Sequence, residues 1–380
     1  MRTFLLYEYE TIKDKEISLF IKNHKELHPY FKEEWGEIKP LHYCGVINMD
    51  GQNIFILPKI TTRNQETNLH IFTYMLLCAY DIKLYHQDRA FALNHKSDFF
   101  LEVLVQHFAK ELLQEFTKGL YKTYITQEEN LRTLRGKYLI TQNIRHNFTK
   151  SKIYCEFDEF SADNELNRFF LFALQTFLPF VKQKKYIKEC ILALDGVRRQ
   201  TFDIKSIKLH FHKLNSRYKP SYEFAVMLLQ RYIPLFANGE KSFAFLFDMN
   251  ELFEQFIGKI YQQIDTTTQL QKQKNYGSLV LKPDILTRNM IIDTKYKKLS
   301  SREELRVGDK YQMFVYGINL KIHQTMLLYP KHLEDVKENL QLGKGDTIVH
   351  LKMRSIDLDF DGEYEKFLDV IRERVGKINE

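Results

Sequence analysis

The segment of residues 277–298, GSLVLKPDILTRNMIIDTKYKK, constrains the fold more than any other part of this chain. Two short runs rich in Val, Ile and Leu flank a polar turn, which predicts two β-strands joined by a tight loop at residues 288–289. That loop places Asp284 directly opposite Asp293, with Cβ atoms about 5 Å apart. Lys295 shares the face of Asp293, because side chains alternate along a strand. The sequence therefore predicts two carboxylates and one ammonium on a small patch.

Such a patch is unfavourable unless something compensates its charges. Two carboxylates at this distance raise each other's pKa, and opposed like charges destabilise a hairpin. A divalent cation removes the conflict, since Mg²⁺ prefers one or two carboxylates together with water. The ion can activate a water and neutralise charge on a phosphate, while the lysine orients the nucleophile or stabilises the developing charge. The simpler interpretation is a surface hairpin in which Asp284 and Lys295 form an exposed ion pair.

Two further segments predict helices near this patch. In residues 309–317, Gln312 and Tyr316 are four apart and lie on one helical face. In residues 248–257, four apolar side chains recur at helical spacing and Glu254 lies among them. The alternatives are an ordinary amphipathic helix with Tyr316 in the core, and a solvated Glu254 on a polar face.

Length and charge limit the class of protein. A chain of 380 residues is long enough for two or three domains with their own cores. Charged residues at 28% and hydrophobic residues at 44% are typical of a soluble protein. A net charge of +7 permits nucleic-acid binding without requiring it.

The cysteines and the apolar runs favour a cytoplasmic protein. The four cysteines are scattered, which fits reduced, buried thiols better than a disulfide framework. The first acidic residue comes too early for a signal peptide. The most apolar run, residues 169–181, contains Gln175 and is too short to span a bilayer. We therefore expect no membrane segment. The cysteines are Cys44, Cys78, Cys155 and Cys190.

The N-terminal part predicts a mixed α/β domain. Strands are expected at residues 3–9, 42–49 and 53–58, the last two around the turn dipeptide Asp50-Gly51, and helices at 68–80 and 97–118, the latter capped by Gly119. Residues 131–152 then contain basic but no acidic side chains, while residues 155–165 are acidic. The basic run can follow a nucleic-acid backbone or meet an acidic partner, or it can be a solvated face. The charge inversion predicts a domain boundary near residue 150.

The C-terminal part, residues 151–380, predicts a helical segment followed by an α/β unit with its core at about 240–335. Helices are expected at 164–180, 221–233 and 362–375, and strands at 324–329 and 347–351. His210 and His212 would lie on one face of a strand and could bind a metal. No third ligand is evident nearby, so a structural role is favoured.

Several of these segments carry a family resemblance. Pro283-Asp284 followed by Asp293-Thr294-Lys295 resembles the core motif of the PD-(D/E)xK nucleases, and Gln312 with Tyr316 resembles the extra motif of their RecB-like branch. Taken in order, the chain resembles the McrC family, the nuclease subunit of McrBC-type modification-dependent restriction systems. The supporting segments include residues 45–47, 56–60, 131–137, 155–160, 163–168, 215–218, 252–254, 283–285, 293–297, 311–312 and 328–330.

The resemblance implies a fold, a reaction and a set of residues. The fold would be an N-terminal mixed α/β domain that docks to a partner, followed by a restriction-endonuclease-like domain with a mixed sheet flanked by helices. The second domain would cut DNA at a Mg²⁺ site, with Mn²⁺ as an alternative ion. Asp284 and Asp293 would be metal ligands, Glu254 a further acidic ligand, Lys295 the catalytic lysine and Gln312 a further catalytic residue.

The resemblance also implies a partner. Residues 1–150 would dock onto a hexameric AAA+ GTPase of the McrB type and stimulate its GTPase. GTP would be bound by that partner, in agreement with the lack of a G-x-x-x-x-G-K-[ST] loop in this chain. The substrate would be double-stranded DNA carrying a modification such as 5-methylcytosine.

Two other functions compete with this one. A non-catalytic adaptor could use a nuclease-like domain only to bind DNA or to scaffold the GTPase. The complete set of Asp284, Asp293 and Lys295 argues against it, because a relic could lose any of them. The second alternative is a stand-alone RecB-like repair nuclease, which would need no GTPase.

Overall fold

The chain forms two compact units in the computed structural model. The first comprises Met1–Asp98 together with Arg231–Glu380, and the second comprises Phe99–Gln230. The boundary predicted near residue 150 coincides with neither limit, because strands on both sides of that position pair within the second unit. The structure describes residues 3–49, 52–82, 99–148, 151–237, 240–297, 307–331 and 335–379.

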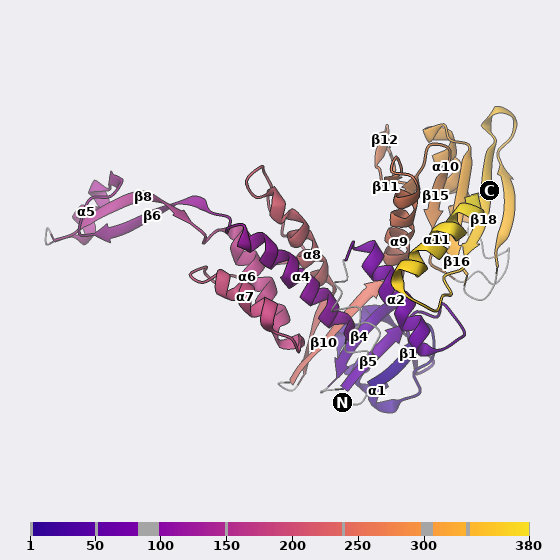
Figure 1. Ribbon diagram of the computed structural model, residues 1–380, viewed down its shortest axis with the longest axis horizontal. Helices are drawn as coiled ribbons and strands as arrows, with labels where there is room; N and C mark the ends of the chain where they lie inside the picture. Colours follow the sequence, from indigo (N-terminus) through magenta and orange to yellow (C-terminus); the bar gives the residue numbers. More distant parts are fainter. Residues whose placement is uncertain are drawn as a thin grey trace. The chain divides into compact units, whose positions relative to one another are not determined.

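The N-terminal sheet of the first unit combines strands from both segments of the chain that make up this unit (Figure 1). Its order is β1-β5-β4-β10-β9; β1 is parallel to β5 and the other pairs are antiparallel. The two strands predicted at 42–49 and 53–58 pair as a hairpin, while their expected turn at Asp50-Gly51 lies outside the described residues. The strands are β1 (Thr3–Tyr7), β4 (Tyr43–Met49), β5 (Gln52–Leu57), β9 (Tyr232–Ala237) and β10 (Glu240–Asp248).

The C-terminal sheet is mixed, as predicted. Its order is β11-β14-β15-β16-β18-β17, with β15, β16 and β18 parallel and the other neighbours antiparallel. The predicted strands at 324–329 and 347–351 correspond to β16 and β18. The strands are β11 (Gln269–Leu270), β14 (Ile285–Leu286), β15 (Ile291–Thr294), β16 (Gln324–Pro330), β17 (Lys337–Leu342) and β18 (Val349–Ile356).

Three helices accompany the C-terminal sheet (Figure 1). They are α9 (Met249–Ile264), α10 (Val307–Leu320) and α11 (Tyr364–Asn379). Helix α9 begins where Asp248 accepts a hydrogen bond from the amide of Asn250 at 2.8 Å, and it buries the predicted apolar residues. Helices α9 and α11 contact each other, and α9 also contacts α2 (Gln65–Ala79), the helix predicted at 68–80.

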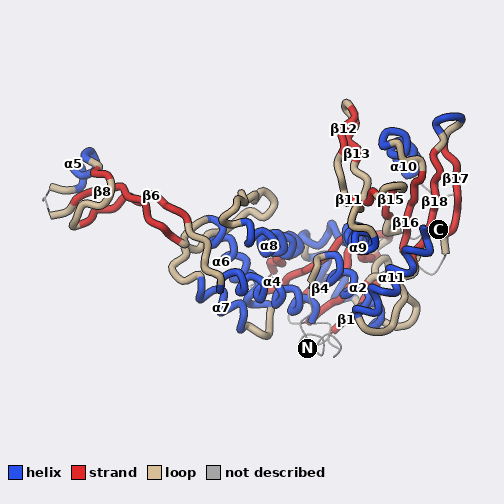
Figure 2. The backbone as a smooth tube through the Cα atoms, turned by 45° about the horizontal axis from the view of Figure 1, so that its top comes forward, coloured by secondary structure: helices blue, strands red, loops and turns tan. Residues whose placement is uncertain are grey.

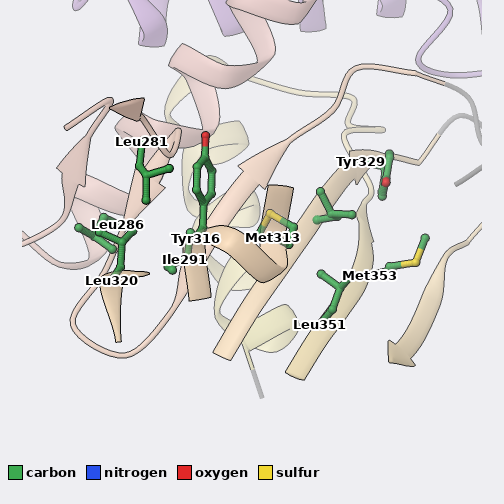
Figure 3. Packing of buried hydrophobic residues seen from close by; sticks show 10 residues of the cluster. Leu281, Leu286, Ile291, Met313, Tyr316, Leu320, Tyr329, Leu351 and Met353 are labelled. Carbon is green, nitrogen blue, oxygen red and sulfur yellow. The ribbon is translucent and has the colours of Figure 1, made fainter. Parts of the chain in front are cut away.

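Helix α10 packs on one face of the C-terminal sheet. Met313, Tyr316 and Leu320 from the helix join alternate residues of β15, β16 and β18 in one buried cluster (Figure 3). Because side chains alternate along a strand, Asp293 belongs to the same face as Ile291 in this cluster. The packing of α10 thus places its residues over the strand that carries Asp293. The strand members are Ile291, Leu327, Tyr329, Leu351 and Met353.

The first unit contains several smaller elements. They are α1 (Lys15–Asn23), η1 (Lys25–Tyr30), β2 (Phe31–Glu34), β3 (Glu37–Pro40), β12 (Lys274–Tyr276), β13 (Leu279–Leu281) and η5 (Gly345–Thr347). Strands β12 and β13 form a separate hairpin next to the C-terminal sheet (Figure 2).

The second unit joins a helical group to a three-stranded sheet with the order β6-β8-β7 (Figure 2). The helix predicted at 97–118 begins at Phe99 in the described chain, and Gly119 follows it with a φ of 104°. The elements are α4 (Phe99–Thr117), β6 (Thr123–Leu131), β7 (Lys137–Tyr138), α5 (Ile140–His146), β8 (Ile153–Ser161), α6 (Glu165–Phe177), η2 (Leu178–Phe180), α7 (Lys185–Ala193), η3 (Ser216–Tyr218) and α8 (Lys219–Arg231).

The prediction of a strand that carries His210 and His212 is wrong. This segment is irregular, and Nε2 of His212 lies 3.0 Å from the Tyr121 hydroxyl. The side chain of Asn215 accepts from the amide of His212 and donates to the carbonyl of His210. These hydrogen bonds close a local loop.

The four cysteines are free and buried, as expected. Within the described ranges, the helices are too short or too polar to cross a membrane.

Candidate active site

The hairpin at residues 284–294 has the predicted register. Ile285 pairs with Ile292 and Leu286 with Ile291, and the amide of Thr287 donates to the carbonyl of Met290 at 3.0 Å. The loop is therefore residues 288–289, and counting outward sets Asp284 against Asp293. Regular pairing in β14 starts only at Ile285, so Asp284 lies just before the strand.

Asp293 is almost completely buried. Its side chain is 1% exposed, and Oδ2 forms an ion pair with Nζ of Lys295. Its Oδ1 accepts from Nε2 of Gln312 at 3.4 Å, which links the strand to α10. Burial, together with the charge of Asp284, raises the pKa of Asp293 to about 7, although Lys295 opposes that shift. The site thus holds a carboxylate that needs positive charge in order to ionise.

Asp284 is oriented by the strand opposite. Its Oδ2 accepts from the amide of Thr294 at 2.7 Å and from the Thr294 hydroxyl at 2.9 Å. Burial raises the pKa of Asp284 in spite of these donors and of the positive charges of Lys295 and Lys282. Oδ1 accepts no hydrogen bond from any described residue, so it is the oxygen left for a ligand.

Lys295 remains an ammonium at neutral pH. Burial favours its neutral form, but the charges of Asp293 and Asp284 outweigh burial and raise the pKa of Lys295. Its side chain is 26% exposed, so the amine can meet a molecule arriving from solvent.

Gln312 and Tyr316 form a hydrogen-bonded pair on α10. Nε2 of Gln312 donates to the Tyr316 hydroxyl at 3.0 Å, and that hydroxyl donates to the carbonyl of Lys282 at 3.1 Å. Tyr316 is also part of the buried cluster, with 7% exposure (Figure 3). The tyrosine therefore fills the core and links α10 to the segment before Asp284.

Glu254 approaches the site from α9. Its Oε1 accepts from Nε2 of Gln271 at 2.5 Å. Burial raises the pKa of Glu254, and the charge of Asp284 adds to the effect, so the two carboxylates are electrostatic neighbours. In the described part of the chain, His, Cys, Asp and Glu side chains form no group of three suited to hold a metal. Glu254 is therefore near the pair rather than part of a formed cluster.

The donor set fits a hard divalent cation. Oδ2 of Asp293 is buried, and its partner among the described residues is the ammonium of Lys295. Two carboxylates with raised pKa values are what a divalent cation would stabilise, and Mg²⁺ commonly keeps several waters beside one or two carboxylates.

Thr294 and Lys282 contribute to the site in ways that their spacing in the sequence does not indicate. Alternation along the strand places Thr294 on the face opposite Asp293, yet Thr294 holds Asp284 by two hydrogen bonds. Alternation along the strand does not predict the contact between Thr294 and Asp284, because Asp284 lies outside the regular pairing. Lys282 acts through its carbonyl and its charge, which side-chain spacing does not reveal.

The mixed sheet, its flanking helices and the Asp-Asp-Lys hairpin define an α/β protein in which a buried carboxylate pair lies beside a lysine, in the same compact unit as the N-terminal sheet. The family model described as McrBC 5-methylcytosine restriction system component matches residues 38–330. The chain belongs to this family and is a subunit of a McrBC-type restriction system, which confirms the resemblance seen in the sequence.

Solved structures are also similar. One is described as the refined half-complex from a tetradecameric assembly of Thermococcus gammatolerans McrB AAA+ hexamers with bound McrC; it has 22% identity, a TM-score of 0.60, and covers 99% of this chain and 100% of that chain. This likeness shows a common fold. The second is the cryo-EM structure of the Thermococcus gammatolerans McrBC complex, with 25% identity over 68% of this chain and 87% of that chain, and a TM-score of 0.49. No curated protein matches the chain.

Proposed function

We propose that this chain is the Mg²⁺-dependent DNA endonuclease subunit of its restriction system. The observation that carries the proposal is the buried carboxylate of Asp293. It contacts Lys295 and Gln312, and it lies close enough to Asp284 for the charge of Asp284 to raise its pKa. In this proposal Asp284 and Asp293 hold the metal, with Mn²⁺ as an alternative ion. Glu254 is a further acidic ligand and Gln312 a further catalytic residue.

The residues of this chain divide the work. Bound Mg²⁺ would supply a water of lowered pKa and positive charge beside the scissile phosphate. The Lys295 ammonium stabilises negative charge that develops on the phosphate. Gln312 orients Asp293 through its Nε2, and Thr294 orients Asp284 through its amide and hydroxyl.

We infer that the partner is a hexameric AAA+ GTPase of the McrB type, which binds the GTP and whose hydrolysis this chain stimulates. Family membership and the likeness to a McrC bound to McrB hexamers support this inference. Between residues 124 and 148, Tyr124, Ile144 and Phe148 are 74%, 70% and 92% exposed. Large apolar side chains in water are typical of a surface that a partner covers. The substrate is double-stranded DNA with a 5-methylcytosine-type modification.

The proposal is tested by GTP-dependent cleavage of methylated and unmethylated DNA in the reconstituted complex. Lys295→Ala or Asp284→Ala should abolish cleavage and leave partner binding and GTPase stimulation unchanged, because neither residue lies within residues 1–150, the region proposed to dock the partner. Lys331→Ala is the matched control: Lys331 is in the same unit, is 34% exposed and pairs with Asp357 at 3.7 Å. Undiminished cutting by Lys295→Ala, or equal loss in the control, would refute the site assignment.

A further inference from the structure

Tyr296, the residue after Lys295, anchors the site to the N-terminal sheet. Its side chain is 3% exposed, and its ring centroid lies 6.0 Å from that of Phe253 on α9. Its hydroxyl donates to Oε1 of Glu8 at 2.5 Å. Lys295 instead turns toward Asp293. Two consecutive side chains therefore contact different parts of the first unit.

Glu8 directly follows β1 and is itself buried, with 3% exposure. Its Oε1 also accepts from the amide of Lys59, just beyond β5, at 3.1 Å. Its Oε2 is buried and has no hydrogen-bond partner among the described residues. Burial raises the pKa of Glu8 to about 7, although the hydrogen bond from Tyr296 opposes the shift. A carboxyl group in such a place costs free energy that an apolar side chain would avoid.

The backbone between Lys295 and Lys297 couples the position of Tyr296 to the position of the Lys295 side chain. The amide of Lys295 donates to the carbonyl of Leu328 on β16 at 2.9 Å, and the amide of Lys297 donates to the carbonyl of Lys295 at 3.0 Å. Nζ of Lys297 donates to Asp309 on α10 at 2.7 Å. Residues 295, 296 and 297 thus hold three carboxylates from β15, the end of β1 and α10. A shift of any of these supports would move the Lys295 amine.

We propose that Glu8 is a positioning residue for the candidate site: by holding the Tyr296 hydroxyl, it fixes the backbone that sets Lys295 against Asp293. The inference rests on the proposed function, because it takes Lys295 to act on DNA. It adds a regulatory consequence. Strands β1 and β5 lie within residues 1–150, the region proposed to dock the GTPase, so a displacement of either strand caused by docking would reach the catalytic lysine through one hydrogen bond.

Four single variants and one double variant test this link. Tyr296→Phe and Glu8→Met remove the hydrogen bond while nearly keeping side-chain volume, and Glu8→Gln keeps an acceptor oxygen for Tyr296. Tyr261→Phe is the matched control, because Tyr261 is also 3% exposed in the first unit and its hydroxyl donates to Asn379 at 2.7 Å. Three quantities are measured. Two are the single-turnover cleavage rate of the reconstituted complex and its DNA affinity. The third is the extent to which a limiting amount of an amine-reactive acetylating reagent modifies Lys295 in the isolated chain, measured by mass spectrometry.

We expect Tyr296→Phe and Glu8→Met to cleave DNA about tenfold or more slowly than the wild type at unchanged DNA affinity, since small displacements of catalytic groups have large effects on rate. The variant carrying both changes should cleave no more slowly than either alone, because both remove the same interaction. Glu8→Gln should restore most of the rate. Acetylation of Lys295 should change in Tyr296→Phe and Glu8→Met and remain at the wild-type level in Glu8→Gln and Tyr261→Phe.

Equal behaviour of Tyr296→Phe and Tyr261→Phe in both cleavage and acetylation would overturn the inference. Should Glu8→Met fail to fold, the comparison of the two tyrosine variants still decides. Should the wild-type complex not cut DNA, the proposed function fails, and the acetylation of Lys295 alone decides whether Glu8 positions it.

Discussion

Thr294 shows how a residue without charge can control a charged site. It lies between Asp293 and Lys295 in the chain and donates two hydrogen bonds to Asp284. Residues that orient metal ligands in this way typically change metal affinity by about 10–100-fold when they are lost. Thr294 is therefore a place where the proposed metal site can be weakened without removing a ligand.

We predict that Thr294→Val raises the Mg²⁺ concentration needed for half-maximal cleavage by about tenfold, because Asp284 loses the hydroxyl donor but keeps the amide donor. Thr325→Val is the matched control: Thr325 is buried in the neighbouring strand β16, and its hydroxyl donates to the carbonyl of His350 at 3.0 Å. The Mg²⁺ dependence of cleavage is compared for both variants. An equal shift in both would mean that the hydroxyl of Thr294 acts on the sheet rather than on the site.

The buried carboxyl of Glu8 makes stability depend on pH. Its folded pKa of about 7 exceeds the ordinary value of 4.5, so the folded state keeps a proton that the unfolded state loses between these values. The contribution of Glu8 to stability is fully present below pH 4.5 and is lost as the pH rises to 7. The titratable groups whose charges interact with Glu8 are Tyr9, His42, Cys44 and Tyr296.

We predict that Glu8→Gln removes a slope of about 1.4 kcal/mol per pH unit from the free energy of unfolding between these two pH values. The measurement is urea unfolding of the metal-free protein at several pH values, with Tyr261→Phe as the variant that leaves the slope unchanged. A wild-type slope that survives in Glu8→Gln would show that other groups are responsible.

At the level of elements, the sequence predicted what local periodicity specifies and missed what depends on distant partners. The hairpin around residues 288–289 and helices α9 and α10 follow from their own residues. Strand β17 has the sequence KENLQL, in which exposure alternates but the residues are too polar to predict a strand. It forms because it can pair with β18 at the sheet edge. The segment with His210 and His212 alternates like a strand, but Asn215 satisfies its backbone locally.

Helix α10 carries Gln312 to the site, so its fit against the sheet matters for function. A Cβ added at Gly317 would lie 2.7 and 2.8 Å from the two methyl groups of Val349 on β18. Gly308, in the same helix, has nothing within 4 Å of such an atom.

We predict that Gly317→Ala destabilises the protein by up to about 2 kcal/mol, since an overpacking cost of about 1–3 kcal/mol outweighs the gain of about 1 kcal/mol in helix propensity. Gly308→Ala should be neutral or slightly stabilising. Thermal unfolding of both variants checks the difference, and cleavage by Gly317→Ala should fall with the displacement of Gln312. Equal stability of the two variants would show that β18 yields to the added methyl group.

At the level of the whole molecule, the sequence predicted which segments meet around Asp293, but it did not predict the division into units. Asp284, Asp293, Lys295, Gln312 and Glu254 all come from segments whose type and spacing are local. The unit limits depend on β10 returning to pair with β4 and on β9 pairing with β10, which no local pattern reports. The charge inversion near residue 150 falls inside the sheet of the second unit instead of between units.

The organisation of the first unit has a functional meaning within our proposal. Both sheets lie in one compact unit, and the Glu8–Tyr296 hydrogen bond joins them. A GTPase that moves the N-terminal sheet could therefore act on the site without contacting DNA there. Within this proposal the partner binds the GTP, which agrees with the lack of a G-x-x-x-x-G-K-[ST] loop in this sequence.

The central claim is that Asp284 and Asp293 hold a divalent cation together. Calorimetric titration of the isolated chain with Mg²⁺, and in parallel with Mn²⁺, tests this most directly when wild type is compared with Asp293→Asn. We predict one or more binding sites in the wild type that disappear in Asp293→Asn. The neutral amide cannot supply the negative charge with which the Asp293 carboxylate would bind the cation. Equal binding by both proteins, or no binding by the wild type, would contradict the account.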